Sequence, residues 1–437
     1  MAPHILEIPN EIIDLILDEL DDSPESKFKL MSTCQQFRRC LLPRIYSACQ
    51  LNFGRTKHIP TAFLCDRTAA GVWLLHKNYP EHGRLVESLS ISFSTKFFIE
   101  GLVLDETDDF GMTRSPQYVL GKLLPQFDTL RRVRLDYVNH YRNIPYDLGG
   151  FVDTLCMVLS RRSLKEVSIN LVFRTEDKRT WGVEEQKLDA SNGWTSPYPP
   201  MANLDKLDIS FQEKECPYQL QDLSDTAFAW LIGVFLRLFE LPCQSLKCLK
   251  FKYRADRHRS PDLRHCPLNL LDPHPEPDRI MNRPGGQLRL PNLETLTISV
   301  SDAGRWAFEQ YFDIDFENIK SLLLFGIYDN ITQNDLNFLR KFTSLSVLHL
   351  QYPARKYFGN WIESAVSLRE SCQTLRKVVI YGQGSPSTNA SQLEEFLRKY
   401  GKFYNACIEE KEVPAHMTDQ GVKPDDYTLY LYLPFVV

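Results

Sequence analysis

The stretch Leu130-Arg131-Arg132-Val133-Arg134-Leu135 recurs along this chain as a phrase of the form L-x-x-L-x-L/I. Apolar residues occupy its first, fourth and sixth positions, and mostly polar residues occupy the others. Alternation of this kind is typical of a strand that buries one face. Nine copies occur, at residues 86–91, 130–135, 164–169, 204–209, 246–251, 293–298, 319–324, 345–350 and 375–380. The sequence therefore predicts a series of equivalent strands.

The spacing of the copies indicates how the strands are connected. The copies that begin at 293, 319 and 345 lie 26 residues apart, within the range of roughly 20 to 29 residues that leucine-rich repeats show. In the middle of the chain the spacing is nearer 40 residues. We therefore predict an α/β fold, an irregular leucine-rich-repeat-like solenoid with parallel strands and insertions. The Asn that regular repeats place after the strand is mostly missing, with Asn139 as the nearest equivalent.

Helical patterns occupy the gaps between the copies, where the return limb of each repeat belongs. They are predicted at 115–124, 150–161, 224–241, 302–312, 332–342, 357–371 and 391–404. Residues 427–433 alternate with period two, and we expect this last strand to pair with the C-terminal edge of the array as a cap.

Polar strand positions would line the concave side of such an array and form its binding surface. Residues of this kind include Lys165, Glu166 and Asp205. The candidate substrate-binding residues are Arg131, Arg134, Asp208, Lys250 and His349.

Polar, proline-rich segments interrupt the pattern at 174–203, 254–291 and 409–426. Such compositions are typical of surface loops, which are either inert insertions or flaps over the binding surface. His258, His265, Cys266 and His274 gather in the second segment, but their spacing fits no recognised zinc motif, and we predict no metal site.

The N-terminal residues 5–52 predict three short helices. Pro9 and Glu11 favour a helix start, Ser23-Pro24-Glu25 supplies a second start signal, and Phe37, Leu41 and Leu42 carry a third pattern. A unit this small usually needs a disulfide, a metal or a partner to be stable. No metal-ligand spacing is present, so a partner is the natural inference.

Three groups of residues in this region resemble the F-box family: Ile8-Pro9-x-Glu11-Ile12-Ile13-x-x-Ile16-Leu17-x-x-Leu20, Thr33-Cys34-Gln35-Gln36-Phe37 and Pro43-Arg44-Ile45-Tyr46. Ile8 and Phe37 depart from the usual Leu and Trp but remain apolar. The resemblance implies docking onto the Skp adaptor of a cullin-RING ubiquitin ligase, while the rest of the chain selects a protein substrate. The residues that would carry or support the adaptor contact are Ile8, Pro9, Glu11, Ile12, Ile16, Leu20, Leu30, Cys34 and Phe37.

Composition limits the functional classes and cellular compartments to which the protein can belong. The 437 residues carry a net charge of -5, which argues against a broad nucleic-acid-binding surface. Eleven cysteines without a Cys-x-x-Cys pair fit a reducing compartment, and the N-terminus lacks the pattern of a signal peptide, so we expect a cytoplasmic or nuclear protein. The apolar run at 227–236 is too short to span a membrane, and no membrane contact is predicted.

The sequence contains no recognised catalytic motif, and we predict neither enzymatic activity nor a cofactor. The predicted organisation is an F-box at 1–52, a helical linker at 53–84 that contains a helix at 68–79, and the repeat domain at 85–437. The predicted function is a ligase substrate receptor that binds the adaptor and, through it, the cullin. The alternative is a leucine-rich scaffold without a ligase role, and a hydrolase or transferase is a weaker third possibility.

Overall fold

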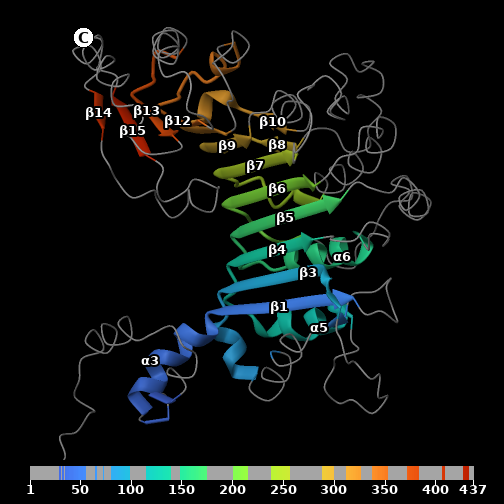
Figure 1. Cartoon of the computed structure of the whole chain (residues 1–437). Coiled ribbons are helices and arrows are strands. Elements are labelled where there is room, and N and C mark those ends of the chain that lie inside the picture. The colour runs from blue at the N-terminus through green and yellow to red at the C-terminus, as the bar shows by residue number, and fades with distance from the viewer. Residues whose placement is uncertain are drawn as a thin grey trace, which may run out of the picture. The chain divides into compact units, whose positions relative to one another are not determined.

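The computed structural model describes sixteen stretches of the chain: residues 29–30, 32–33, 35–55, 64–65, 72, 80–98, 115–138, 148–174, 200–214, 238–255, 288–299, 312–325, 337–352, 372–382, 406–408 and 427–432. The chain divides into two compact units. Unit 1 comprises Met1–Asn170 with Ser196–Ala202, and unit 2 comprises Leu171–Thr195 with Asn203–Val437. The protein is an α/β protein with mostly parallel strands, as predicted (Figure 1).

Unit 1 is built on the strands β1 (Ala48–Arg55), β2 (Leu64–Cys65), β3 (Ser88–Phe98) and β4 (Arg132–Val138). Their order is β4-β3-β1-β2, in which β1, β3 and β4 are parallel and β2 is antiparallel to β1. The next strand, β5 (Glu166–Arg174), contains the boundary between the two units.

Unit 2 holds the strands β6 (Lys206–Lys214), β7 (Cys248–Ala255), β9 (Thr295–Ser299), β11 (Ser321–Phe325), β12 (Val347–Tyr352) and β13 (Lys377–Gly382), which are parallel in this order. A separate parallel pair consists of β8 (Leu288–Leu290) and β10 (Phe312–Ile314). The strand β15 (Tyr427–Tyr432) pairs with β13 antiparallel, so the predicted pairing at the C-terminal edge is confirmed. However, β14 (Ala406–Ile408) lies outside β15, so β15 is not itself the edge strand.

All nine copies of the sequence phrase lie on strands, which confirms the strand prediction. The helices α5 (Pro116–Leu123) and α6 (Leu148–Leu159) confirm two of the seven predicted helices. Ser115 caps α5, because its hydroxyl accepts a hydrogen bond from the Tyr118 amide at 3.3 Å. Of the helices predicted at 224–241 and 332–342, the structure describes residues 238–241 and 337–342, in which 238–239 and 337–339 are helical. Phe312, the last residue of the helix predicted at 302–312, begins the strand β10 instead. The other two predicted helices, the histidine cluster and most of the insertions lie outside the described residues, although β8 lies at the end of the insertion predicted at 254–291.

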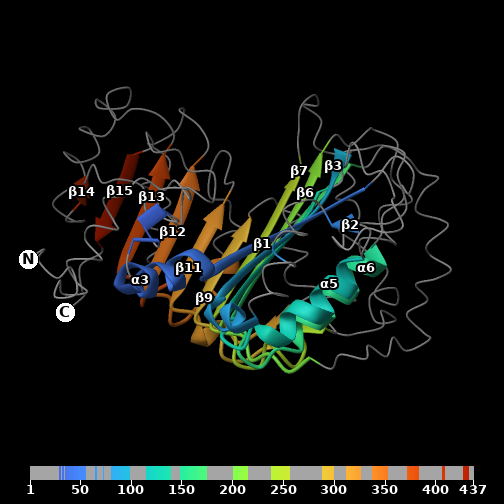
Figure 2. The ribbon, with the colours of Figure 1, turned by 90° about the horizontal axis from the view of Figure 1, so that it is seen from below.

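The core of unit 1 contains a row of aromatic side chains. Phe53, Phe93 and Tyr137 are in register on β1, β3 and β4, and all are buried. Phe151 of α6 packs edge-on against Phe93 and Tyr137, with ring centroids 5.7 and 5.5 Å away. Both α5 and α6 therefore cover one face of these strands, as Figure 2 shows from below. The described side chains of the other face are at least partly exposed, and it is termed the open face.

One backbone hydrogen-bond pattern is repeated where the strands start. The Glu87 carbonyl, at the second position of its phrase, accepts bonds from the amides of Arg131 and Arg132 in the following copy, at 2.9 and 3.0 Å. The carbonyls that accept two amides in this way are those of Ser47, Glu87, Arg131, Asp205, Lys247, Glu294, Lys320 and Ser346. These bonds hold eight of the nine copies, all but the one at 204–209, in register with the segment before them.

Side chains reinforce this pattern one residue before each copy. In eight of the nine copies that residue is Ser, Thr or Asn, at 129, 163, 203, 245, 292, 318, 344 and 374. The Thr129 hydroxyl lies 2.7 Å from the Arg84 carbonyl and 3.1 Å from that of Val86, and Thr374 bonds to Thr343 and Leu345 in the same way. The side-chain amides of Asn292 and Asn318 donate to the carbonyls of Gln244 and Pro291, each of which lies two residues before the preceding copy. These Ser, Thr and Asn residues, which we call the polar ladder, precede the strands, whereas the sequence pattern of regular repeats places an Asn after the strand.

The N-terminal region contains a strand that the sequence analysis missed. β1 spans the boundary predicted at 52/53, and it follows the helix α3 (Gln35–Tyr46) after a single residue, Ser47. Leu41 of α3 is fully buried, and Leu30, Phe37, Cys40 and Ile45 pack around it. Of the helix predicted at 68–79, the structure describes Val72, which is helical.

Replacing Thr129 with Val should lower the free energy of unfolding by about 1–2 kcal/mol, because two backbone carbonyls lose their hydroxyl partner. Chemical denaturation of the full chain measures this change. Thr129→Ser keeps the hydroxyl and serves as the control. Equal stability of the Val variant and the parent would show that the ladder does not contribute.

Two glycines of unit 1 should respond oppositely to alanine. A Cβ on Gly83 would lie 2.8 Å from both the Cβ and the carbonyl oxygen of Gln126, so Gly83→Ala should destabilise the protein by about 1–3 kcal/mol. A Cβ on Gly121, within α5, would meet only the flexible end of Met157 at 3.6 Å. Gly121→Ala should therefore stabilise by roughly 0.5–1 kcal/mol. Thermal unfolding of both variants checks the contrast.

Candidate binding face

The strands of unit 1 present a polar face opposite α5 and α6. It is formed by the third, fifth and seventh positions of the phrase and their equivalents on β1. The same positions define the corresponding face in unit 2, which is given the same name although some of its residues are buried. In unit 1 the described polar side chains on the open face are all at least partly exposed. They are Gln50, Asn52, Ser88, Ser90, Ser92, Arg132, Arg134, Asp136, Glu166, Ser168 and Asn170.

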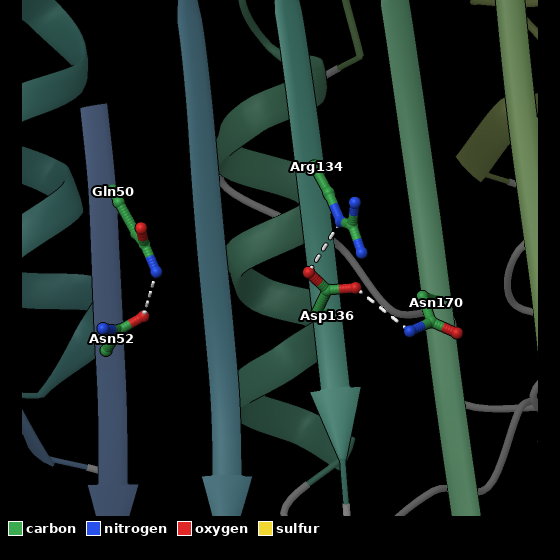
Figure 3. Close-up of polar contacts among 5 residues, drawn as sticks. All are labelled: Gln50, Asn52, Arg134, Asp136 and Asn170. Carbon is green, nitrogen blue, oxygen red and sulfur yellow. Dashed lines mark hydrogen bonds and ion pairs between the residues drawn. The ribbon is translucent and has the colours of Figure 1, made fainter. Parts of the chain in front are cut away.

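Hydrogen bonds order the side chains of this face (Figure 3). The Arg134 Nε donates to Asp136 Oδ2 at 2.8 Å, and the Asn170 Nδ2 donates to Asp136 Oδ1 at 3.1 Å. Both oxygens of the carboxylate are therefore engaged, and the Asp136 side chain is only 16% exposed, against 62% for Arg134. The helices lie behind the strands in this view, so the network faces away from the core.

A second polar pair lies on β1, where Gln50 Nε2 donates to Asn52 Oδ1 at 3.1 Å. The strand β3 separates it from the Arg134 network, with Ser90 in register between Gln50 and Arg134 and Ser92 between Asn52 and Asp136. Short hydroxyls thus stand between longer amide and charged side chains. The face offers ordered donors and acceptors with little net charge, which suits recognition of a polar surface by hydrogen bonds.

The open face of unit 2 changes character along its fifth-position row. Asp208, Lys250, Thr297, Leu323, His349 and Val379 are aligned by the strand register. Asp208 and Lys250 form an ion pair with a 3.9 Å separation between Oδ2 and Nζ, and their side chains are 22% and 15% exposed. Thr297, Leu323 and Val379 are buried. The charged part of the row therefore lies on β6 and β7.

The structure places four of the five candidate substrate-binding residues at one repeat position. Arg134, Asp208, Lys250 and His349 all occupy the fifth position, on the open face. Arg131 occupies the second position, immediately before β4, where its side chain is exposed and its backbone belongs to the carbonyl pattern. Lys165 and Asp205 share that second position.

The candidate adaptor residues are described in part. Leu30 and Phe37 are half-buried and pack against Leu41. The other seven lie outside the described residues: Ile8, Pro9, Glu11, Ile12, Ile16, Leu20 and Cys34.

Sequence reasoning missed Gln50, Asn52, Asp136 and Asn170. The last two occupy the seventh position, one residue beyond the six-residue phrase, and the continued alternation through Tyr137 would have found Asp136. Gln50 and Asn52 were missed because Tyr46-Ser47-Ala48-Cys49-Gln50-Leu51 is a further copy in which Tyr and Cys replace the leucines. The Ser47 carbonyl, which accepts the amides of Glu87 and Ser88, marks this equivalence.

Three of the buried cysteines have raised pKa values. Burial raises the pKa of the Cys49 thiol to about 12 and that of Cys372 to about 11, and it raises the pKa of Cys243 further. Among the described residues, no group of three or more His, Cys, Asp or Glu side chains could hold a metal ion. No helix among them has the length and apolar character needed to cross a membrane.

The chain was compared with protein-family models and with curated protein sequences. No protein-family model matches the chain, and no curated protein sequence matches it significantly.

The buried thiols should resist alkylation in the native protein. Cys49, Cys243 and Cys372 are buried with raised pKa values, so at neutral pH they remain protonated and shielded from iodoacetamide. Cys40 and Cys248 are partly exposed and should be modified before these three. Mass spectrometry of the native protein and of the urea-unfolded protein measures the difference. Rapid native labelling of Cys243 would contradict the packing.

Proposed function

We propose that this protein is a substrate-receptor subunit of a cullin-RING ubiquitin ligase, with an F-box that docks onto a Skp adaptor. The observation that carries the proposal is the resemblance of residues 8–46 to the F-box, which continues without a linker into the first strand. The repeats that follow form a degenerate leucine-rich-repeat domain. This assignment is supported by the nine copies of the phrase and by the parallel strands. It is supported further by the carbonyls that each accept two amides and by the polar ladder.

The joint between α3 and the strands favours this role. Ser47 is the only residue between α3 and β1, and its carbonyl accepts the amides of Glu87 and Ser88, both at 2.9 Å. At the end of α3, the Tyr46 ring lies 4.6 Å from that of His82 in the 3₁₀ helix Pro80–Leu85. Such a joint holds the last F-box helix at a fixed position relative to β1 and β3.

A fixed joint is useful because a receptor of this kind performs no bond chemistry of its own. It holds a substrate lysine near the charged conjugating enzyme, and the transfer then becomes effectively intramolecular. In this proposal the open faces of the repeats bind the substrate. The ordered Arg134-Asp136-Asn170 network and the exposed polar side chains around it supply the contacts in unit 1.

A leucine-rich scaffold without a ligase role is the second candidate, because the same polar face would serve any protein partner. Deleting residues 1–52 would not separate the two, since that deletion removes most of β1 and exposes the edge of β3. Point substitutions in the first predicted helix leave the strands intact and are the sharper test.

The wild-type chain should co-purify with a Skp adaptor in stoichiometric amount, and Ile12→Asp combined with Ile16→Asp should abolish this. Truncating a buried interface anchor typically costs about 2 kcal/mol or more, and a buried carboxylate costs further desolvation. Arg134→Ala, on the open face, is the matched control and should retain the adaptor. Failure of the wild type to bind, or binding that survives the double substitution, would overturn the proposal in favour of the scaffold.

A further inference from the structure

A cluster of charged side chains lies on the open face of β6 and β7, in unit 2. Lys206 and Asp208 are two residues apart on β6, so their side chains leave the same face. The strand register places Lys250 opposite Asp208 and Lys252 opposite Ser210. Three lysines therefore surround one carboxylate on two neighbouring strands, which lie side by side in Figure 1.

The described side chains of this face on the two strands are Lys206, Asp208, Ser210, Cys248, Lys250 and Lys252. Three ammonium groups and one carboxylate give them a net charge of +2. Neighbouring side chains on one face of a sheet stand roughly 5–7 Å apart, so one bound segment can contact side chains of both strands. Lys250 and Asp208 are mostly buried, and solvent screens charges at such a site less than at an open surface.

We propose that the open face of β6 and β7 binds an acidic peptide segment, whose carboxylates contact Lys206 and Lys252 on either side of the Asp208–Lys250 pair. An ammonium group has three donors, so each lysine can keep a neighbour in the protein and still bind a ligand oxygen. The inference rests on the proposed function, because it assigns this segment to the substrate.

A peptide fits this face better than a nucleic acid does. Nucleic-acid binding needs a continuous track of positive charge and, for single strands, aromatic side chains on which bases stack. Here Asp208 interrupts the lysines, and the described side chains of this face on β6 and β7 include no aromatic residue. A peptide can place its carboxylates beside the lysines and leave Asp208 uncovered.

Fluorescence anisotropy with the purified full chain and a labelled oligo-glutamate peptide tests the proposal. We expect saturable binding that weakens as salt is added, and none with a length-matched oligo-glutamine peptide. Lys206→Gln combined with Lys252→Gln should weaken binding at least about fivefold, because two exposed ion pairs are lost. Lys122→Gln, an exposed lysine of α5, should leave the affinity unchanged.

Asp208→Asn gives a prediction of opposite sign. It keeps the volume and an acceptor for Lys250 but removes the competing carboxylate, so affinity for oligo-glutamate should rise about threefold. No binding by the wild type, equal binding of oligo-glutamine, preference for oligothymidylate, or insensitivity of both variants would overturn the proposal. The assay contains no adaptor, so its failure would leave adaptor docking intact, and a failed co-purification would leave peptide binding intact.

Discussion

The backbone carbonyl at the second position of each repeat is the constraint on which the rest of the structure depends. It accepts two amides from the following copy, and this happens at eight carbonyls from Ser47 to Ser346. A strand that slipped by one residue would lose both bonds and would turn its buried residues to the open face. The Ser, Thr or Asn side chain that precedes the repeat adds hydrogen bonds at the same level, as Thr129 and Thr374 do. Register is thus decided where each strand starts.

The candidate binding face follows from this register. Because side chains alternate along a strand, a fixed start places the fourth, sixth and eighth residues of each repeat in the core. The third, fifth and seventh residues then lie on the open face. Equivalent positions then stand beside one another on neighbouring strands, as Ser90 and Arg134 do in unit 1 and Asp208 and Lys250 do in unit 2. The residue types at these few repeat positions therefore determine the chemistry of the face. It is nearly neutral and hydrogen-bonded in unit 1, whereas lysine predominates on β6 and β7.

Local pattern was sufficient to predict most of the described strands. Period-two alternation identified ten of them, the nine phrase copies and β15, and the capping signal at Ser115-Pro116 identified α5. It failed at β1, where the half-buried Tyr46 and the buried Cys49 replace the expected leucines, because a search for leucine does not recognise other side chains at the equivalent positions. It also failed for the polar ladder, since the partner carbonyls of Thr129 lie some forty residues earlier in the chain.

The sequence by itself determined most of the strands and which of their residues are buried, because alternation is a local property and burial of apolar side chains drives it. It also supplied the resemblance at residues 8–46 on which the proposed function depends. Only the tertiary structure decided which polar residues meet. Asn170 reaches Asp136 across 34 residues of chain, and Lys250 reaches Asp208 from the next strand. These contacts arise from strand pairing between distant segments of the chain. Because the intervening loops differ in length, the contacts cannot be predicted from the spacing of residues in the sequence.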